Sequence, residues 1–204
     1  LLPLSKGRRI GDGIQCGYHG MTFDQTGTCI RIPGQDKIPA KAYVESRLVH
    51  QRHDIVWVWM GDPVLASVDD IFDMTEFTDP SWEAHQGGQL HLNSHYLNVA
   101  ENLVDPAHVS FVHSTTLGSV ASEDVRVKTD TTGDPIVAWR WIRNAPPVGF
   151  FQEFGNFAGN VDRWHYYYLH LPCTAVIDFG IADVEVNIAE DQRNQWLRIF
   201  SLHF

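Results

Sequence analysis

The sequence is poor in cysteine and in positive charge, and it has no long apolar run. Only 3 of its 204 residues are cysteines. This odd, sparse set argues against a disulfide framework and favours a reducing cytoplasm. Lysine and arginine total 15 against 25 acidic residues, so the net charge is -10. We therefore expect neither nucleic acid nor an anionic membrane as a partner, and no apolar stretch approaches the roughly 20 residues of a membrane span.

Several common motifs are also absent. The sequence has no G-x-G-x-x-G, no P-loop and no G-x-S-x-G, which argues against a dinucleotide fold, a nucleotidase and a serine hydrolase. It starts without methionine or a signal peptide, and it stops at Phe204 within an alternating apolar run. We expect it to be an internal piece of a longer protein.

What is present suits a packed core. Hydrophobic residues make up 44% of the chain, with 7 Trp, 11 Phe and 6 Tyr, and the length allows one large domain or two small ones. Residues 1–63 predict a small all-β module, because short β-rich runs alternate with Gly-containing turns and residues 55–60 are typical of a strand. Acidic residues at 67–79 indicate a solvated connector.

The remainder predicts a second domain of the α+β class. We expect a strand at 89–97 that runs into a helix at about 96–112. Alternation then indicates strands at 125–128, 136–142, 164–171 and 195–204. An antiparallel sheet packed against the helix is the architecture that this order favours.

Asp105, His108 and His113 form the pattern D-x-x-H-x-x-x-x-H, which begins in the second half of that helix and ends just after it. One interpretation is ordinary: Asp105 caps a helix that has Pro106 at its first position. The other is a metal site, since such clusters of imidazole and carboxylate are typical of metal or catalytic centres. His113 lies about 140° round an ideal helix from His108, so both reach one ion only if the helix bends or ends between them. We favour the metal.

Cys16 and His19 form a second, shorter pattern, C-x-x-H, flanked by glycines that allow a tight turn. Alone it is equally typical of a buried cysteine beside a loop histidine. Cys29 has no histidine at this spacing, and we expect it to be structural. Arg8 and Arg9 are interpreted as solvated, with contact to a redox partner as the alternative.

Residues 13–29 give this pattern a specific context. They read G-I-Q-C-G-Y-H-G-M-T-F-D-Q-T-G-T-C and resemble the second half of a Rieske iron–sulfur motif, in which two His replace two Cys on one iron of a [2Fe–2S] cluster. The full motif begins with C-x-H. Residues 1–15 resemble the gap that follows it, so we expect the first pair just before Leu1.

The half-motif and the D-x-x-H-x-x-x-x-H pattern together resemble the Rieske non-heme iron aromatic-ring-hydroxylating oxygenases. Residues 95–119, H-Y-L-N-V-A-E-N-L-V-D-P-A-H-V-S-F-V-H-S-T-T-L-G-S, are most similar to the branch of vanillate O-demethylase and phthalate-type oxygenase subunits. The resemblance implies a small all-β Rieske domain at 1–63. It also implies an antiparallel-sheet catalytic domain with helices, of the helix-grip (START-like) type, at 64–204, each lacking one end.

The same resemblance implies roles for individual residues. Cys16 and His19 would bind the [2Fe–2S] cluster, and His108 and His113 would be the two histidines of a 2-His-1-carboxylate site for mononuclear Fe(II). Asp105 matches a bridging carboxylate that accepts a hydrogen bond from a cluster histidine of a neighbouring subunit. The third iron ligand is expected beyond the C-terminal residue, so no acidic residue at 178–191 is assigned to it.

Asn102 would lie near the iron. The implied activity is mono- or dioxygenation: hydroxylation of an aromatic compound, or O-demethylation of a vanillate-like one with release of formaldehyde. The implied partners are O₂, a small aromatic substrate and a flavin/iron–sulfur reductase that draws on NAD(P)H, with a ferredoxin as a further possibility, and the implied assembly is a homotrimer. Two alternatives stay open: an electron-transfer Rieske protein without catalytic iron, and a zinc hydrolase using His108 and His113.

Overall fold

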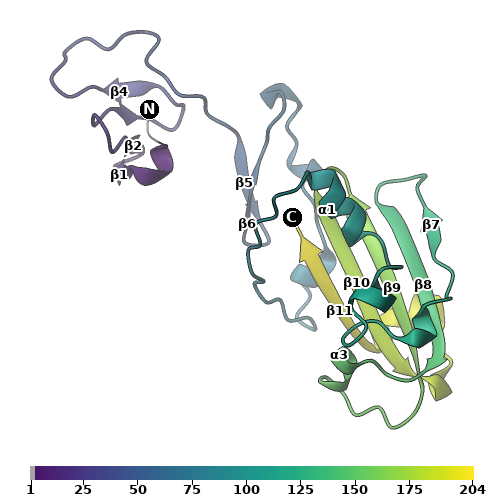
Figure 1. The fold of residues 1–204 in the computed structure, drawn as a ribbon. Helices are drawn as coiled ribbons and strands as arrows, with labels where there is room; N and C mark the ends of the chain where they lie inside the picture. The colour runs from purple at the N-terminus through teal and green to yellow at the C-terminus, as the bar shows by residue number, and fades with distance from the viewer. Residues whose placement is uncertain (1–2) are drawn as a thin grey trace. The chain divides into compact units, whose positions relative to one another are not determined.

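The structure is a computed structural model that describes residues 3–204. Contacts divide the chain into two compact units, Leu1–Ala84 and His85–Phe204 (Figure 1). Residues 64–84 thus belong with the first unit by contact. The boundary after residue 63 divides the expected iron–sulfur domain from the expected catalytic domain, and it stays a prediction.

All the strands of the first unit lie before residue 63, as predicted for the β module, and short 3-10 helices occupy Leu4–Lys6, Pro63–Leu65, Val68–Asp70 and Thr75–Phe77. Its four-stranded antiparallel sheet has the order β1-β2-β3-β4, and β5 and β6 form a separate two-stranded ribbon. A small core gathers Cys16, Phe23 and Cys29. Glycines with positive φ at 11, 27 and 34 make the predicted turns. The bounds are β1 Arg8–Ile10, β2 Gly13–Gln15, β3 Thr22–Phe23, β4 Cys29–Arg31, β5 Val49–Arg52 and β6 Ile55–Val58.

The second unit is built on a five-stranded antiparallel sheet of order β11-β10-β9-β8-β7. Its centre is the pairing of β9 with β10 over ten residues each, from Thr174 opposite His170 to Asp183 opposite Val161. Together with the helices on the sheet, this confirms the α+β class. The bounds are β7 Lys128–Asp130, β8 Ile136–Ala145, β9 Val161–His170, β10 Thr174–Asp183 and β11 Leu197–His203.

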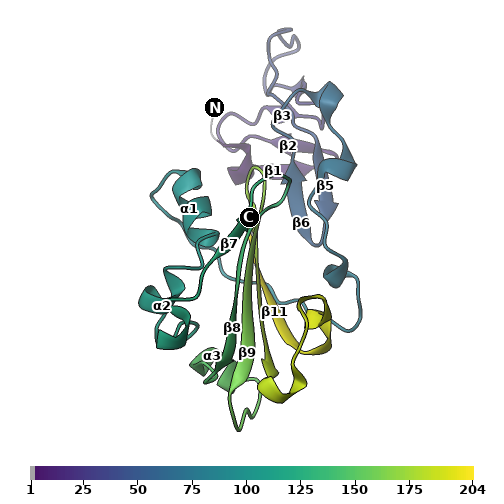
Figure 2. The ribbon, with the colours of Figure 1, turned by 90° about the vertical axis from the view of Figure 1, so that its right-hand side faces the viewer.

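The sheet buries both of its faces, because alternate side chains point to opposite sides. On one face Val161, Tyr167 and Phe179 pack with Val109 and Phe151 from helical segments, and Figure 2 shows α1, α2 and α3 (Gly149–Gln152) on this side. The opposite face buries Trp164, Tyr166, Ala182 and Ile188. The strand β10 escaped prediction since burial on both faces removes the apolar–polar alternation of a half-buried strand.

The helix expected at 96–112 is divided into α1 Tyr96–Leu103 and α2 Val109–Val112. Pro106 lies in the break, and its missing N–H and its ring oppose a continuous helix. His95 caps α1, with Nδ1 accepting the Leu97 N–H at 3.3 Å. The strand expected at 89–97 was wrong: residues 83–98 are exposed, and α1 starts at Tyr96. No neighbouring strand offers residues 89–94 a partner.

The close contact between Gly180 and the Trp164 ring predicts one mutational effect. A Cβ at Gly180 would lie 1.7 Å from Trp164 Cζ2, and the indole is fully buried. We expect Gly180→Ala to lower the free energy of unfolding by about 1–3 kcal/mol through overpacking, measured by urea denaturation. Gly133→Ala is the control, because open space surrounds that position. Equal stability of the two variants would show that the indole moves aside freely.

Candidate functional site

Cys16 and His19 lie on one tight turn of the first unit. The turn is closed by the Cys16 N–H, which donates to Met21 O at 2.8 Å, and by the Gly20 N–H, which donates to Cys16 O at 3.1 Å. Gly20 has φ +72° and a Cβ there would lie 3.0 Å from Pro33 Cγ, so both the conformation and the space favour glycine. The Cys16 side chain is buried, whereas His19 is exposed.

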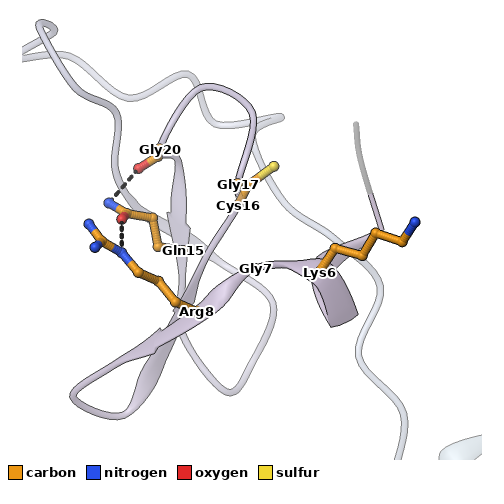
Figure 3. Close-up of a pocket in the computed structure, with 7 residues that line it drawn as sticks. All are labelled: Lys6, Gly7, Arg8, Gln15, Cys16, Gly17 and Gly20. Atoms are coloured by element: carbon orange, nitrogen blue, oxygen red, sulfur yellow. Dashed lines mark hydrogen bonds between the residues drawn. The ribbon is translucent and has the colours of Figure 1, made fainter.

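A cavity of about 300 Å³ lies beside Cys16 (Figure 3). Gln15 braces its wall: Oε1 accepts from Arg8 Nε at 2.8 Å and Nε2 donates to Gly20 O at 3.1 Å. Gly7 belongs to the lining, and a Cβ there would lie 2.3 Å from Gln15 O. A thiol at a cavity edge, with an imidazole on the same turn, fits the donor set for part of a Rieske cluster. The Arg8–Gln15 brace was not predicted.

His108 and His113 stand at the two ends of the single-turn helix α2. His108 is its N-terminal flanking residue and His113 its C-terminal one. Their ring centroids lie 5.4 Å apart at an angle of 63°, so the imidazoles converge although five residues separate them. The expectation that the helix ends near His113 is thus confirmed. His108 Nδ1 is buried and makes no hydrogen bond, although the Asp105 carboxylate lies beside it.

Asp105 does not cap α2. Its Oδ1 accepts the Ala107 N–H at 2.8 Å, so it closes a turn within the break between α1 and α2. Oδ2 lies 3.4 Å from His108 Nδ1, without the geometry of a hydrogen bond. The carboxylate is half-exposed and remains able to accept a bond from outside. Asn102 is exposed on α1, and its carbonyl accepts the Asp105 N–H at 3.3 Å.

The chain after His113 folds back onto α2. The His113 carbonyl accepts N–H groups from Thr116, Leu117 and Gly118 at 3.1, 3.1 and 2.9 Å. A Cβ at Gly118 would lie 2.2 Å from Val109 O and 2.8 Å from Ser110 Cα, so backbone meets backbone here. This return loop, residues 114–122, covers the helix between the two histidines.

Three basic side chains lie fully buried on the α2-facing side of the sheet. They are Arg140 on β8 and Arg163 and His165 on β9. Burial, reinforced by the charges of Arg140 and Arg163, holds the pKa of His165 well below 6.5, so the ring is neutral. Burial also lowers the pKa of Arg163 to about 10. Sequence reasoning missed these residues; the only signal was charge at alternate positions of otherwise apolar strands.

The described residues supply two imidazoles to this site and no third ligand. Within residues 3–204, no three His, Cys, Asp or Glu side chains gather as a metal-binding group. Asp178 is fully buried and paired with Arg198, whose Nη2 lies 2.7 Å from Oδ2, on the other face of the sheet. In the same range no helix is both long and apolar enough to cross a membrane.

Comparison with known proteins gives two family matches. Residues 1–44 match the Rieske [2Fe-2S] domain, and residues 92–204 match the vanillate O-demethylase oxygenase C-terminal domain. The chain is 37% identical to the iron-sulfur subunit of a toluene-4-sulfonate monooxygenase system of Comamonas testosteroni, over 94% of this chain and 56% of the relative. It is 31% identical to the oxygenase subunit of vanillate O-demethylase from a Pseudomonas species, over 88% and 52%.

A solved structure agrees with these matches. Dicamba monooxygenase bound to 3,6-dichlorosalicylic acid superposes with a TM-score of 0.86 and 26% identity, covering 99% of this chain and 58% of that one. The chain thus spans about half the length of the relatives that it matches.

The neutral His165 predicts a dependence of stability on pH. Below about pH 6.5 His165 binds a proton in the unfolded chain but stays neutral in the folded one. The contribution of His165 to the free energy of unfolding is therefore fully present above that pH and decreases as the solution is acidified. The slope approaches about 1.4 kcal/mol per pH unit. We expect His165→Gln to flatten this slope in urea denaturation between pH 8 and 5. At pH 8 the difference between the proteins reports packing alone; identical slopes would contradict the buried neutral ring.

Proposed function

This chain belongs to the family of Rieske non-heme iron oxygenase subunits that includes vanillate O-demethylase, and on that premise we propose that it forms part of the oxygenase component of a Rieske oxygenase system. One observation carries the proposal: the convergence of His108 and His113 at the ends of α2, in a chain that also presents Cys16 and His19 on one turn. A protein that only carries electrons needs Cys16 and His19 but not the two converging histidines.

Two cofactors fit these residues. Cys16 and His19 would hold the [2Fe–2S] cluster, and His108 and His113 the mononuclear iron, as the convergence of the two imidazole rings supports. When bound, the iron centres supply activation of O₂ with electrons delivered one at a time. The chain's own part is to hold the two imidazoles in register, which the return loop and the sheet accomplish through their contacts with Val109 and Ser110.

The proposed reaction is hydroxylation or O-demethylation of a small aromatic substrate. It rests on the relatives, whose names specify toluene-4-sulfonate, vanillate and dicamba. Aromatic side chains are abundant in the second unit, but Phe151 is fully buried in the core, whereas Phe154 is 56% exposed. Packing therefore accounts for Phe151, and only the more accessible rings remain candidates for a substrate surface.

Electron transfer between subunits is the proposed role of Asp105. The carboxylate uses one oxygen on Ala107 and keeps lone pairs free, which supports a hydrogen bond from the cluster histidine of a neighbouring subunit in a homotrimer. Asn102, one helical turn earlier, is proposed to lie near the iron. A flavin/iron–sulfur reductase, with or without a ferredoxin, would supply the electrons in the cytoplasm.

Two other functions are distinguished by simple measurements on the full-length protein. An electron-transfer Rieske protein would contain cluster iron only, so iron quantitation in excess of two per cluster supports the oxygenase and its absence rejects it. A zinc hydrolase would turn over an ester or amide anaerobically without a reductant. The match of residues 92–204 to an oxygenase domain favours the oxygenase over both.

Cluster binding predicts a difference between two buried cysteines. In the full-length protein we expect Cys16→Ala to abolish the Rieske electron paramagnetic resonance signal, because a thiolate ligand is lost. Cys29→Ala is the matched control: Cys29 shares the same small core, yet its Sγ is directed to Arg31 O at 3.5 Å. A signal that survives in the first variant and disappears in the second would reverse the assignment.

The bridging role predicts a kinetic defect without loss of metal. Asp105→Asn retains an Oδ1 for the Ala107 N–H but removes the charge, so we expect both metal centres to load while electron transfer to the mononuclear iron slows at least tenfold in single-turnover experiments. Glu101→Gln, an exposed carboxylate on α1, serves as the control. Unchanged kinetics with Asn at position 105 would refute the bridge.

A further inference from the structure

The helix α2 cannot hold its own shape. It has four residues, far fewer than an isolated helix needs in water, and His113 and the exposed Phe111 and Val112 give it no packing on the outer side. Only Val109 and Ser110 of α2 are buried, and both lie between the two histidines. The contacts of Val109 with the apolar core and of Ser110 with its polar neighbours therefore set where the imidazoles lie.

Ser110 is the meeting point of a buried hydrogen-bond network. Its Oγ lies 2.9 Å from Ser122 Oγ and accepts from Arg140 Nη2 at 3.3 Å. Arg140 Nη1 donates to Ser122 O at 2.8 Å, so one guanidinium spans α2 and the end of the return loop. The Ser122 hydroxyl in turn donates to Ser119 O at 2.7 Å, which leaves Ser110 to donate to Ser122.

Arg163 makes hydrogen bonds to the middle of the return loop. Its Nη2 donates to Ser119 Oγ at 2.9 Å and its Nη1 to Leu117 O at 3.5 Å. Gly118, between these two acceptors, is the residue whose backbone lies against Val109 and Ser110. The two arginines thus bind the return loop from the sheet side, at Ser122 and at Ser119. The loop in turn packs against α2.

The arginines are a costly choice for packing alone. Among the described residues neither guanidinium has a carboxylate within 4 Å, and the Nε of each is buried without a hydrogen-bond partner. Burying an unpaired charge costs several kcal/mol, whereas an apolar side chain of similar volume would fill the space at no such cost. What arginine alone offers is a rigid fork that donates to two oxygens at once.

We propose that Arg140 and Arg163 are positioning residues for the mononuclear iron, which fix the separation of the His108 and His113 imidazoles by holding Ser110 and the return loop against the sheet. This inference rests on the proposed function, since it takes the two histidines to be iron ligands. Neither arginine touches the metal. Each acts through hydroxyl and carbonyl oxygens of the segment that carries the ligands.

The test is the Fe(II) affinity of the mononuclear site in the full-length protein, measured anaerobically by competition with a colorimetric chelator. We expect Arg140→Met and Arg140→Lys each to weaken Fe(II) binding at least tenfold, and Arg163→Lys several-fold. Lysine keeps the positive charge but cannot donate to Ser110 and Ser122 at once. The Arg140→Lys variant therefore distinguishes the effect of the paired hydrogen bonds from the effect of the charge. If charge alone mattered, loss of a cation near Fe²⁺ would tighten binding in Arg140→Met.

The matched control is Arg143→Lys, on the same strand but bonded on the other side to Asp162 at 2.7 Å and to Ile188 O at 2.9 Å. It should bind Fe(II) within twofold of the parent at a comparable loss of melting temperature. Ser110→Ala gives an independent reading if Arg140→Met fails to fold, with several-fold weaker binding expected. Affinities within twofold of the parent, or tighter, in Arg140→Lys and Ser110→Ala overturn the proposal. A parent protein that binds no iron beyond its cluster overturns the proposed function instead.

Discussion

Five residues separate the two histidines, and this spacing is incompatible with one face of a continuous helix. The second unit is arranged around that constraint. Pro106 ends the first helix, α2 contributes one turn, and His113 leaves helical geometry at its end. The price is a helix too short to be stable alone, so its position is set from outside, by the sheet beneath it and by the loop that folds back at Gly118.

The same dependence explains the polar character of an otherwise apolar sheet face. Val161, Tyr167 and Phe179 form the core on which the helical segments pack, while Arg140, Arg163 and His165 occupy neighbouring inward positions. Apolar contacts are tolerant of small shifts, whereas hydrogen bonds of fixed length are not. The two kinds of contact together hold the segment that carries His108 and His113 in a stable and well-defined position against the sheet.

Sequence reasoning succeeded where the determining interactions are local. The C-x-x-H turn, the glycine turns, the strands β6, β8 and β11 and most of β9 follow from patterns a few residues long, although residues 161–167 of β9 are themselves buried on both faces. It failed at β10, which is buried on both faces, and at 89–97, where alternation exists without a neighbouring strand to pair with. Of the two interpretations of Asp105, the helix cap that was not favoured is absent, because the residue closes a turn onto Ala107.

The basic cluster lay beyond any such pattern. The contacts of Arg140 with Ser110 and Ser122 join residues 30 and 18 positions apart, and Arg163 reaches Ser119 across 44. Spacing of this order carries no periodic signal, so only the folded chain reveals which serines the arginines meet. Resemblance to the family supplied the proposed ligand positions, but it said nothing of what holds them in place.

The close contact between Gly180 and Trp164 limits which substitutions this sheet can accept during evolution. The Trp164 ring occupies the volume that any side chain at position 180 requires, and its Nε1 is fixed by a hydrogen bond to Asp178 Oδ1 at 3.1 Å. A change at either position affects the other: a larger residue at 180 needs a smaller one at 164, and a smaller one at 164 removes the indole donor from Asp178, which then keeps its pairing with Arg198. These three positions on two paired strands therefore form a unit of substitution, and relatives are expected to differ there in concert.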